Sequence, residues 1–375
     1  MDKQENPTPL RPPGTVLEAF FPGRLPIRLA PLGQGNINDT WLVELADGDR
    51  RVLQRLHPTV FPDPLPVMRN LRLVTDHLAT VEQPGAPACP SLIATAAGQD
   101  QHLDASGCWR MLTFIDRSRT LASPVTARQA RETGRLLGRF HRLTAGLALN
   151  LLADPLPGFH VTPRYLARFD ALAPHPPARN VLEQHCFAAV TADRHLAPVL
   201  EEAREGLRQQ VIHGDPKLTN VLFAEDEDQA LCLIDLDTVK PGLLLHDLGD
   251  CLRSCCNQQG VEASDPGAAA FVPDLFQALL AGYWPEAGHL LGQADRDLLV
   301  TAARLICFEL GLRFFTDHLE GDRYFKVRRP GQNLHRAAVQ FRLAESVRVQ
   351  EDDLQNRLDR LIRDQSACNS EPAGL

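Results

Sequence analysis

The chain has 375 residues, of which 44% are hydrophobic and 23% charged, which is the composition of an ordinary globular protein with a sizeable core. Its 47 acidic residues outnumber its 39 lysines and arginines, and the net charge of −8 argues against a nucleic-acid partner. The nine cysteines are odd in number and irregular in spacing, which indicates reduced thiols rather than a disulfide framework.

The N-terminal segment is polar and rich in proline and contains no apolar core of a signal peptide. Residues 1–13 are therefore expected to be a disordered tail. The longest apolar stretch, around residues 267–284, is interrupted by Pro273 and Asp274, so we expect no membrane partner. A cytoplasmic location is then the default expectation.

A glycine-containing turn between two strands is the first feature with a chemical interpretation. Strands are expected near residues 27–30 and 40–45, and Gly33 and Gly35 lie in the loop that joins them. In kinases such a turn lies over the nucleotide phosphates and offers them backbone N–H groups. A plain hairpin turn is the alternative interpretation.

The following strand, residues 51–56, lies where most kinases carry a lysine that binds the α- and β-phosphates. This strand has Gln54 and Arg55 instead. Successive side chains of a strand point to opposite faces, so only one of the two can enter the cleft. Arg55 would supply a positive charge there, whereas Gln54 would not.

A small sheet is expected to be completed after one helix. Pro66 suits the start of that helix, and residues 91–96 and 108–115 have the pattern of two further strands. Residues 100–107 would connect these strands.

The end of the last strand is the natural connection to a second lobe. Leu112, Phe114 and Ile115 would form an apolar wall for adenine, and the backbone there would hydrogen-bond the edge of the base. A plain buried strand is compatible with the same residues.

Helical patterns dominate the rest of the chain. Thr126 and Gln129 form a capping box, and residues 155–163 are interpreted as a linker. A long helix is expected from about residue 296 to residue 319. The neighbouring Cys251, Cys255 and Cys256 lack a Cys-x-x-Cys spacing, and we interpret them as buried helical thiols rather than zinc ligands.

Residues 211–237 carry the strongest chemical signal. Two apolar runs predict two buried strands, the first leading into His213-Gly214-Asp215 and the second into Asp235. Phosphoryl transfer needs a carboxylate to accept a hydroxyl proton, together with an amide and a carboxylate to hold Mg²⁺ against the nucleotide phosphates. The spacing therefore predicts Asp215 as the base and Asn220 and Asp235 as the Mg²⁺ ligands. A role in loop capping is the alternative, and the order of strand, loop, strand and acid disfavours it.

These motifs resemble those of the aminoglycoside phosphotransferase and choline kinase superfamily of small-molecule kinases. The resemblance is carried by His213-Gly214-Asp215, Asn220 and Ile234-Asp235-Leu236-Asp237. Within that superfamily the chain is most similar to the N-acetylhexosamine 1-kinases, which phosphorylate the anomeric hydroxyl of GlcNAc and GalNAc. The residues that carry this closer similarity lie between about Leu32 and Lys326, and they are Gly35–Thr40, Val52–Arg55, Asp235–Val239, Leu245–Asp247, Arg313 and Tyr324–Lys326.

The resemblance implies an α+β, two-lobed, protein-kinase-like fold, with a small antiparallel sheet in the N-terminal lobe and a larger, mainly helical C-terminal lobe. Residues 14–115 would form the nucleotide-binding lobe, residues 116–366 the catalytic and substrate-binding lobe, and residues 367–375 a frayed tail. ATP and Mg²⁺ are the implied cofactors.

The resemblance also assigns further site residues. Its register favours Gln54 over Arg55 as the residue in the nucleotide site. Lys217 would either reach a γ-phosphate oxygen or lie exposed in its loop. The residues expected to contact a sugar besides Asp215 are Asn38, Asp237, Thr238, Arg313 and Tyr324.

Two rival functions stay open. One is another kinase of the superfamily, which would act on an aminoglycoside, choline, homoserine or a different sugar. The other is a nucleotide-binding regulator with little turnover, which the missing strand lysine suggests and the intact acids oppose. The sequence sets no oligomeric state.

Overall fold

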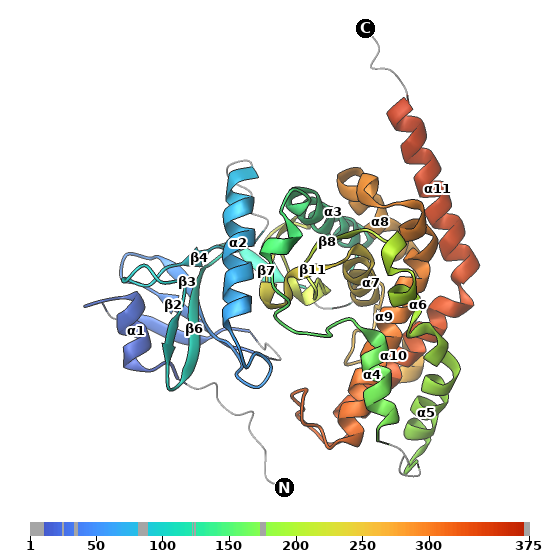
Figure 1. Cartoon of the computed structure of the whole chain (residues 1–375), viewed down its shortest axis with the longest axis horizontal. Coiled ribbons are helices and arrows are strands. Elements are labelled where there is room, and N and C mark those ends of the chain that lie inside the picture. The colour runs from blue at the N-terminus through green and yellow to red at the C-terminus, as the bar shows by residue number, and fades with distance from the viewer. Residues whose placement is uncertain are drawn as a thin grey trace.

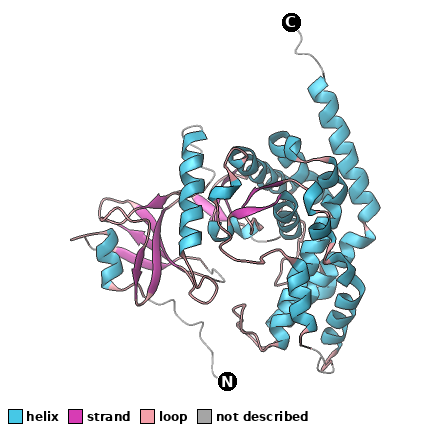
Figure 2. Cartoon of the chain, in the orientation of Figure 1, coloured by secondary structure: helices cyan, strands magenta, loops and turns pink. Residues whose placement is uncertain are grey.

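The computed structural model describes residues 11–24, 26–33, 37–81, 89–121, 123, 125–172 and 178–370, with side chains described up to residue 365. The chain forms two lobes, with the N-terminal sheet on one side and a larger helical part on the other (Figure 1). Figure 2 shows most strands gathered in the N-terminal lobe and most helices in the C-terminal lobe. The predicted α+β, two-lobed fold is confirmed.

The N-terminal lobe is a six-stranded antiparallel sheet with helices on both faces. Its strand order is β1-β2-β3-β6-β4, and β5 pairs with the other half of β6. The elements are α1 (Gly14–Phe20), β1 (Arg28–Pro31), β2 (Asp39–Glu44), β3 (Arg50–Arg55), α2 (Leu65–Val81), β4 (Leu92–Ile93), β5 (His102–Asp104) and β6 (Gly107–Thr113).

Alternation along β6 divides the apolar side chains of this lobe between two faces. Trp109 and Met111 pack with Val16 and Phe20 of α1, whereas Leu112 belongs to the large core that includes α2. Helix α2 therefore lies between the sheet and the C-terminal lobe (Figure 1).

The C-terminal lobe has two small antiparallel sheets, with orders β10-β9-β7 and β11-β8, and its other elements are mainly helices. The strands are β7 (Ser118–Thr120), β8 (Gln209–Ile212), β9 (Val221–Ala224), β10 (Ala230–Leu233) and β11 (Lys240–Leu243). The helices are α3 (Ala127–Thr144), α4 (Thr162–Asp170), α5 (Val181–Asp193), α6 (Val199–Glu202), α7 (Leu244–Cys255), α8 (Pro273–Ala287), α9 (Gln293–Leu319), α10 (Gln332–Val349) and α11 (Glu351–Ser370). Short 3-10 helices are η1 (Leu149–Leu151), η2 (Arg194–Leu196), η3 (Arg204–Gly206), η4 (Leu218–Asn220), η5 (Leu236–Thr238), η6 (Pro266–Ala268) and η7 (Gly288–Leu290).

Some local elements match the sequence-based expectations, and others differ from them. The capping box of Thr126 and Gln129 is present at the start of α3. Residues 100–107 are not a plain connection, because β5 forms there on the edge of β6. Helix α11 continues to Ser370, into the segment expected to fray. In the described part of the chain no helix is long and apolar enough to span a membrane.

Close contact between α3 and α8 fixes one side of the C-terminal core. A Cβ added at Gly134 of α3 would lie 1.9 Å from the Leu279 carbonyl oxygen, and one added at Gly282 of α8 would lie 1.9 Å from the Arg131 carbonyl oxygen. Two helix backbones can approach this closely only where neither carries a side chain. Helix α3 also carries His141, whose Nε2 lies 2.9 Å from the buried carboxylate of Asp247 on α7.

We expect Gly282→Ala to lower the free energy of unfolding by about 1–3 kcal/mol or more, because the added methyl group overpacks the contact between α3 and α8. Chemical denaturation measures the change. Gly146→Ala is the matched control, since its added Cβ would meet its nearest neighbour, His77, at 3.9 Å. Equal stability of the two variants would contradict the close helix contact.

Candidate active site

The loop after β8 is held by a buried carboxylate. Asp247 of α7 accepts hydrogen bonds from the backbone N–H groups of His213 (2.7 Å) and Gly214 (2.8 Å). Burial would raise the pKa of Asp247, but His141, 2.9 Å away, and the other donors hold it below its ordinary value. Gly214 has a φ of +84°, and a Cβ there would lie 2.7 Å from the Thr238 carbonyl oxygen, so this turn requires glycine.

The same loop brings Asp215 close to Asn220 and Lys217, two other residues predicted to belong to the site. The Asn220 amide donates to the Asp215 carbonyl oxygen (2.9 Å) and to its carboxylate (3.2 Å), and Lys217 forms an ion pair with the carboxylate. Burial opposes ionisation of Asp215, but Lys217 outweighs it and holds the pKa of the carboxyl below its ordinary value. Asp215 is therefore an ionised acceptor at neutral pH. His213 supports the loop through the Ile234 carbonyl oxygen, 3.0 Å from its Nε2.

Asp235 ends the neighbouring β10 segment in a left-handed conformation with a φ of +68°, which aspartate tolerates better than most residues. Burial and then repulsion from Asp237 raise the pKa of Asp235 to about 7. No described residue donates a hydrogen bond to its carboxylate. A divalent cation bound to Asp235 would offset both the cost of burying its charge and the repulsion from Asp237. Asp235, with Asn220 nearby, therefore fits a Mg²⁺ site.

The predicted Mg²⁺ ligands and the three neighbouring cysteines bear on whether the described residues could hold a metal ion. Among the described residues, no group of three or more His, Cys, Asp and Glu side chains could hold a metal ion. Cys251, Cys255 and Cys256 are all buried, and burial raises the pKa of each thiol. Their position in and just after α7 agrees with buried helical thiols.

A buried ion pair joins the two lobes beside this centre. Arg110 of β6 pairs with Asp237 of η5, and the two side chains are 1% and 4% exposed. The Asn38 amide donates to the other Asp237 oxygen at 2.5 Å. Both oxygens of Asp237 are thus engaged by residues of the N-terminal lobe. Thr238, its neighbour, donates its hydroxyl to the His213 carbonyl oxygen at 2.9 Å.

The two candidate residues of β3, Gln54 and Arg55, lie on opposite faces of the sheet, and the register with β6 identifies the neighbours of each. Gln54 lies opposite Arg110 on β6, and its Oε1 accepts from the Arg110 guanidinium at 2.8 and 3.0 Å. Arg55 points to the opposite face, where it pairs with Asp39 at 2.9 Å and donates to the Ser106 carbonyl oxygen. On the face of the sheet that carries Gln54, the positive charge therefore comes from Arg110 of β6 rather than from β3.

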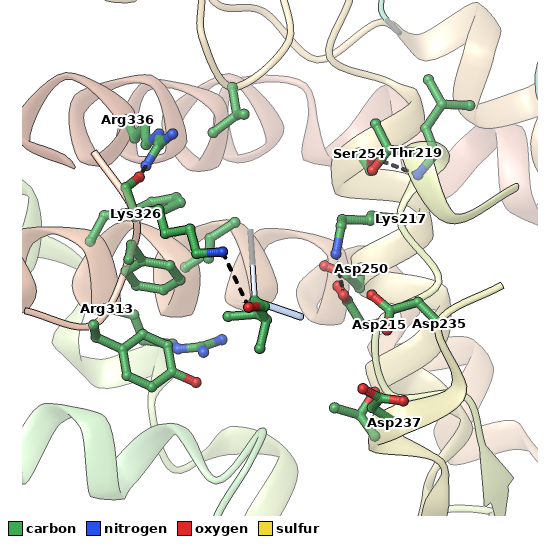
Figure 3. A pocket seen from close by; sticks show the side chains of 18 of the residues that line it. Asp215, Lys217, Thr219, Asp235, Asp237, Asp250, Ser254, Arg313, Lys326 and Arg336 are labelled. Atoms are coloured by element: carbon green, nitrogen blue, oxygen red, sulfur yellow. Dashed lines mark hydrogen bonds and ion pairs between the residues drawn. The ribbon is translucent and has the colours of Figure 1, made fainter. Parts of the chain in front are cut away.

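A cavity of about 1050 Å³ lies between the lobes. Figure 3 shows Asp215, Lys217, Asp235 and Asp237 on one wall, with Arg313 and Lys326 on the opposite side. The predicted residues in the described wall are Gly33, Asn38, Asp215, Lys217, Asp235, Asp237, Thr238, Arg313 and Tyr324. Those that the structure describes but does not place in this wall are Gln54, Arg55, Leu112, Phe114, Ile115 and Asn220. Gly35 lies outside the described residues.

The connection after β6 is already hydrogen-bonded in part. The Ile115 carbonyl oxygen accepts from the Ser118 hydroxyl at 2.6 Å, and the Arg50 guanidinium lies 4.6 Å from the centre of the Phe114 ring. Leu112 is 8% exposed within the core. These three residues do not belong to the described wall of the cavity, and their role in adenine binding stays a prediction.

The wall opposite Asp215 is an aromatic box around Arg313. The guanidinium lies 5.0 to 6.0 Å from four ring centres, which belong to Tyr165, Phe159, Phe325 and Tyr324. These distances are typical of cation–π contact. No carboxylate of the described residues forms an ion pair with Arg313. Arg313 of α9 and Tyr324 of the following loop thus lie together in this box, and their contact with a sugar stays a prediction.

Sequence reasoning missed Arg110, His160 and Glu309. Arg110 stands out in the sequence only as a charged residue within an apolar strand. His160 lies in the segment interpreted as a linker, and Glu309 is one of several charged residues of a long helix. Their partners are too distant in the chain for spacing to pair them.

We expect Arg110→Met to lower the free energy of unfolding by about 3–5 kcal/mol, because it leaves the buried Asp237 carboxylate unpaired. Thermal or urea unfolding checks this. The matched control is Arg50→Met, which breaks the exposed pair with Asp116 and is expected to cost less than about 1 kcal/mol. If both variants lose the same small amount, the interlobe pair does not stabilise the protein.

Comparison with known proteins agrees with this geometry. The chain resembles the solved aminoglycoside phosphotransferase of Alicyclobacillus acidocaldarius, with 15% identity, a TM-score of 0.63, and coverage of 93% of this chain and 97% of the other. It also resembles a microcompartment-associated aminopropanol kinase, with 18% identity, a TM-score of 0.59, and coverage of 88% and 94%. The amicoumacin kinase hAmiN, solved with AMP-PNP, Ca²⁺ and amicoumacin, matches at 14% identity with a TM-score of 0.55, over 90% and 91% of the two chains.

These three likenesses show a shared fold. The family model described as the APH phosphotransferase enzyme family matches residues 28–289, which include the whole catalytic loop and Asp235. The chain is therefore a member of the phosphotransferase enzyme family, a small-molecule kinase family.

Proposed function

We propose that this kinase transfers the γ-phosphoryl group of ATP to the anomeric C1 hydroxyl of an N-acetylhexosamine, GlcNAc or GalNAc. The observation that carries the choice of a neutral acceptor is the charge balance of the cavity wall. Each acidic side chain in the described wall except Asp235 has a basic partner. The pairs are Asp39–Arg55, Asp215–Lys217, Asp237–Arg110, Asp250–Arg253, Glu262–Arg336 and Glu309–His160.

This balance disfavours a polycationic acceptor. Recognition of an aminoglycoside would call for free carboxylates at the acceptor end of the cleft. The positive charges of the described wall that form no ion pair with a described carboxylate include the Arg313 guanidinium, which would repel an ammonium group of an aminoglycoside, choline or an amino alcohol. Arginine hydrogen bonds and aromatic faces suit the hydroxyls and the apolar ring face of a neutral sugar. The structural relatives named for cationic acceptors therefore share the fold without setting the substrate.

The chemistry assigned to the residues is proton acceptance and orientation. Ionised Asp215 accepts a hydrogen bond from the acceptor hydroxyl, aims its oxygen at the γ-phosphorus, and takes the proton as the new P–O bond forms. An anomeric hydroxyl is more acidic than an ordinary alcohol, so a base with an ordinary or lowered pKa suffices. Asn220 and Asp235 would hold Mg²⁺, which would offset the negative charge of the nucleotide phosphates.

Lys217 has two partners in this scheme. Its ammonium pairs with Asp215, which together with the neighbouring Asp235 raises the pKa of Lys217 against the effect of burial. When ATP is bound, a γ-phosphate oxygen would compete for this ammonium group. Release of Lys217 toward the phosphate would free Asp215 for the acceptor hydroxyl.

The assay that tests the function couples ADP release to Mg²⁺-ATP turnover with GlcNAc, GalNAc, glucose, galactose, kanamycin, choline and homoserine. Turnover confined to the N-acetylhexosamines supports the proposal. Turnover on another acceptor keeps the kinase chemistry and contradicts the sugar site, whereas binding of ATP without turnover on any acceptor supports a regulatory protein.

Asp215→Asn is expected to lower kcat by roughly 10²–10⁴-fold, because the amide cannot accept the hydroxyl proton. The same coupled assay measures the loss. Asp226→Asn is the matched control, because the Asp226 side chain is 70% exposed and its pair with Arg117 lies on the surface. Near-normal turnover of Asp215→Asn would exclude Asp215 as the base.

Arg313→Met should raise the KM for the sugar by about tenfold, the equivalent of one lost hydrogen bond to a charged donor, and leave the KM for ATP unchanged. Initial rates at varied sugar and fixed, saturating ATP measure it. Arg323→Met is the matched control, because the Arg323 side chain is exposed on the same connection between α9 and α10. An unchanged KM for the sugar would remove Arg313 from the acceptor site.

A further inference from the structure

A second buried ion pair lies behind the catalytic loop. His160, between η1 and α4, is 4% exposed, and its Nδ1 lies 2.9 Å from Oε1 of Glu309, which is itself 1% exposed. Nε2 of His160 lies 2.7 Å from the Gly214 carbonyl oxygen. Thr162 donates to the other Glu309 oxygen at 2.6 Å. His160 also adopts a left-handed conformation with a φ of +63°, a strained geometry that is concentrated at functional sites.

The hydrogen-bond pattern defines the charge of His160. A backbone carbonyl oxygen can only accept, so Nε2 must carry a hydrogen to bond Gly214. The Glu309 carboxylate also accepts, so Nδ1 must carry a hydrogen as well. An imidazole with hydrogens on both nitrogens is an imidazolium cation. His160 and Glu309 are therefore a charged pair.

Gly214, and with it the two successive peptide units that meet at its Cα, is thus held from both sides by charged groups. Asp247 takes the Gly214 N–H, and His160 donates to the Gly214 carbonyl oxygen, whose carbon is bonded to the nitrogen of Asp215. Hydrogen bonds to charged groups are stronger than those between neutral groups. Glu309 lies one helical turn before Arg313 on α9, so the pair also ties the catalytic loop to the helix that carries the acceptor wall.

We propose that the buried His160–Glu309 pair is a positioning device for phosphoryl transfer, which orients the Gly214–Asp215 peptide so that the Asp215 carboxylate meets the acceptor hydroxyl. This proposal rests on Asp215 as the base, and not on the identity of the acceptor. His160 and Glu309 act through Gly214, so they are positioning residues.

Other charges around the pair set its response to pH. Burial alone would lower the pKa of His160, but Glu309 and then Asp250 raise it above its ordinary value. Burial would raise the pKa of Glu309, and His160 holds it at about 2. The titratable and charged groups that face the pair from neighbouring elements are His246 and Asp250 of α7, Arg313 of α9, Tyr165 of α4 and Lys240 of β11.

The direction of the pH effect follows from the raised pKa. The charged pair is intact below the ordinary histidine pKa and is lost as the pH rises through the raised pKa of His160. Glu309 stays ionised throughout that range. His246, stacked 5.1 Å from His160, does not compete, because burial and the His160 charge lower its pKa to about 3.

The first test reads the charge of His160 without any acceptor. The full chain is labelled with ¹⁵N at histidine, and the His160 ring signals are those that disappear in His160→Asn. Asparagine is chosen because it tolerates the left-handed backbone conformation. We expect both ring nitrogens to be protonated at pH 7 and their titration to move to lower pH in Glu309→Gln. A neutral His160 ring at pH 7 would overturn the proposal.

The second test reads the effect on rate as ADP release, with the best acceptor and also without acceptor, where water accepts the phosphoryl group. We expect His160→Asn to lower kcat by roughly 10–100-fold with little change in the KM for ATP. The rate of the parent protein should fall at alkaline pH, where His160 loses its charge. This fall should be absent in His160→Asn and should begin at lower pH in Glu309→Gln. His195→Asn, at an exposed histidine, is the matched control and should keep the parental profile.

The outcomes separate this proposal from the proposed function. Variants that lose rate while keeping the parental pH profile would show a merely structural role and overturn it. If no acceptor is phosphorylated but the hydrolytic rate shows the expected profiles, the acceptor is wrong and the positioning role stands. If His160→Asn does not fold, Glu309→Gln alone decides, because a parental profile in that variant contradicts the role.

Discussion

The two backbone hydrogen bonds accepted by Asp247 are the constraint on which the active site depends. A buried carboxylate is costly unless it is hydrogen-bonded and balanced by charge or polar donors. Here the His213 and Gly214 N–H groups and the His141 ring meet that requirement, and His141 in turn contacts the Tyr283 hydroxyl at 2.9 Å. His141 lies on α3 and Tyr283 on α8, so the close packing of those helices positions the carboxylate that shapes the catalytic loop. The helix packing of the core and the active-site loop are therefore connected, because a change at the contact between α3 and α8 would alter the position of Asp247 and hence of the loop.

Pairing of acidic side chains with cations is the main electrostatic feature of the described cleft wall. Asp215 and Asp237 each meet a cation, so the region around Asp235 has a single carboxylate left to attract Mg²⁺. Arg110 reaches this region from β6, across from Gln54, and is buried in its pair with Asp237. On the opposite wall the Arg313 guanidinium lies among aromatic rings rather than carboxylates. We expect a site built in this way to favour a neutral, hydroxyl-rich acceptor over a polycation.

Sequence patterns could predict the parts of this structure that are local. The apolar runs before Asp215 and Asp235 mark β8 and β10, and the Thr126 capping box marks the start of α3. Alternation reduced the choice on β3 to Gln54 or Arg55, but the register with β6 was needed to decide between them. Arg110 and Asp237 are separated by 127 positions, and His160 and Glu309 by 149, so no local spacing links them. β5 was missed because three residues at a sheet edge carry too little periodicity to be seen.

The central claim is that Asp215 directs the γ-phosphoryl group of ATP to the anomeric hydroxyl of an N-acetylhexosamine. The most direct test is ³¹P NMR of the product formed from Mg²⁺-ATP and GlcNAc or GalNAc. The account predicts a phosphate signal split by coupling to the anomeric proton, and release of inorganic phosphate on mild acid treatment. A stable phosphomonoester coupled to the protons of another carbon, or inorganic phosphate as the only product besides ADP, would contradict it.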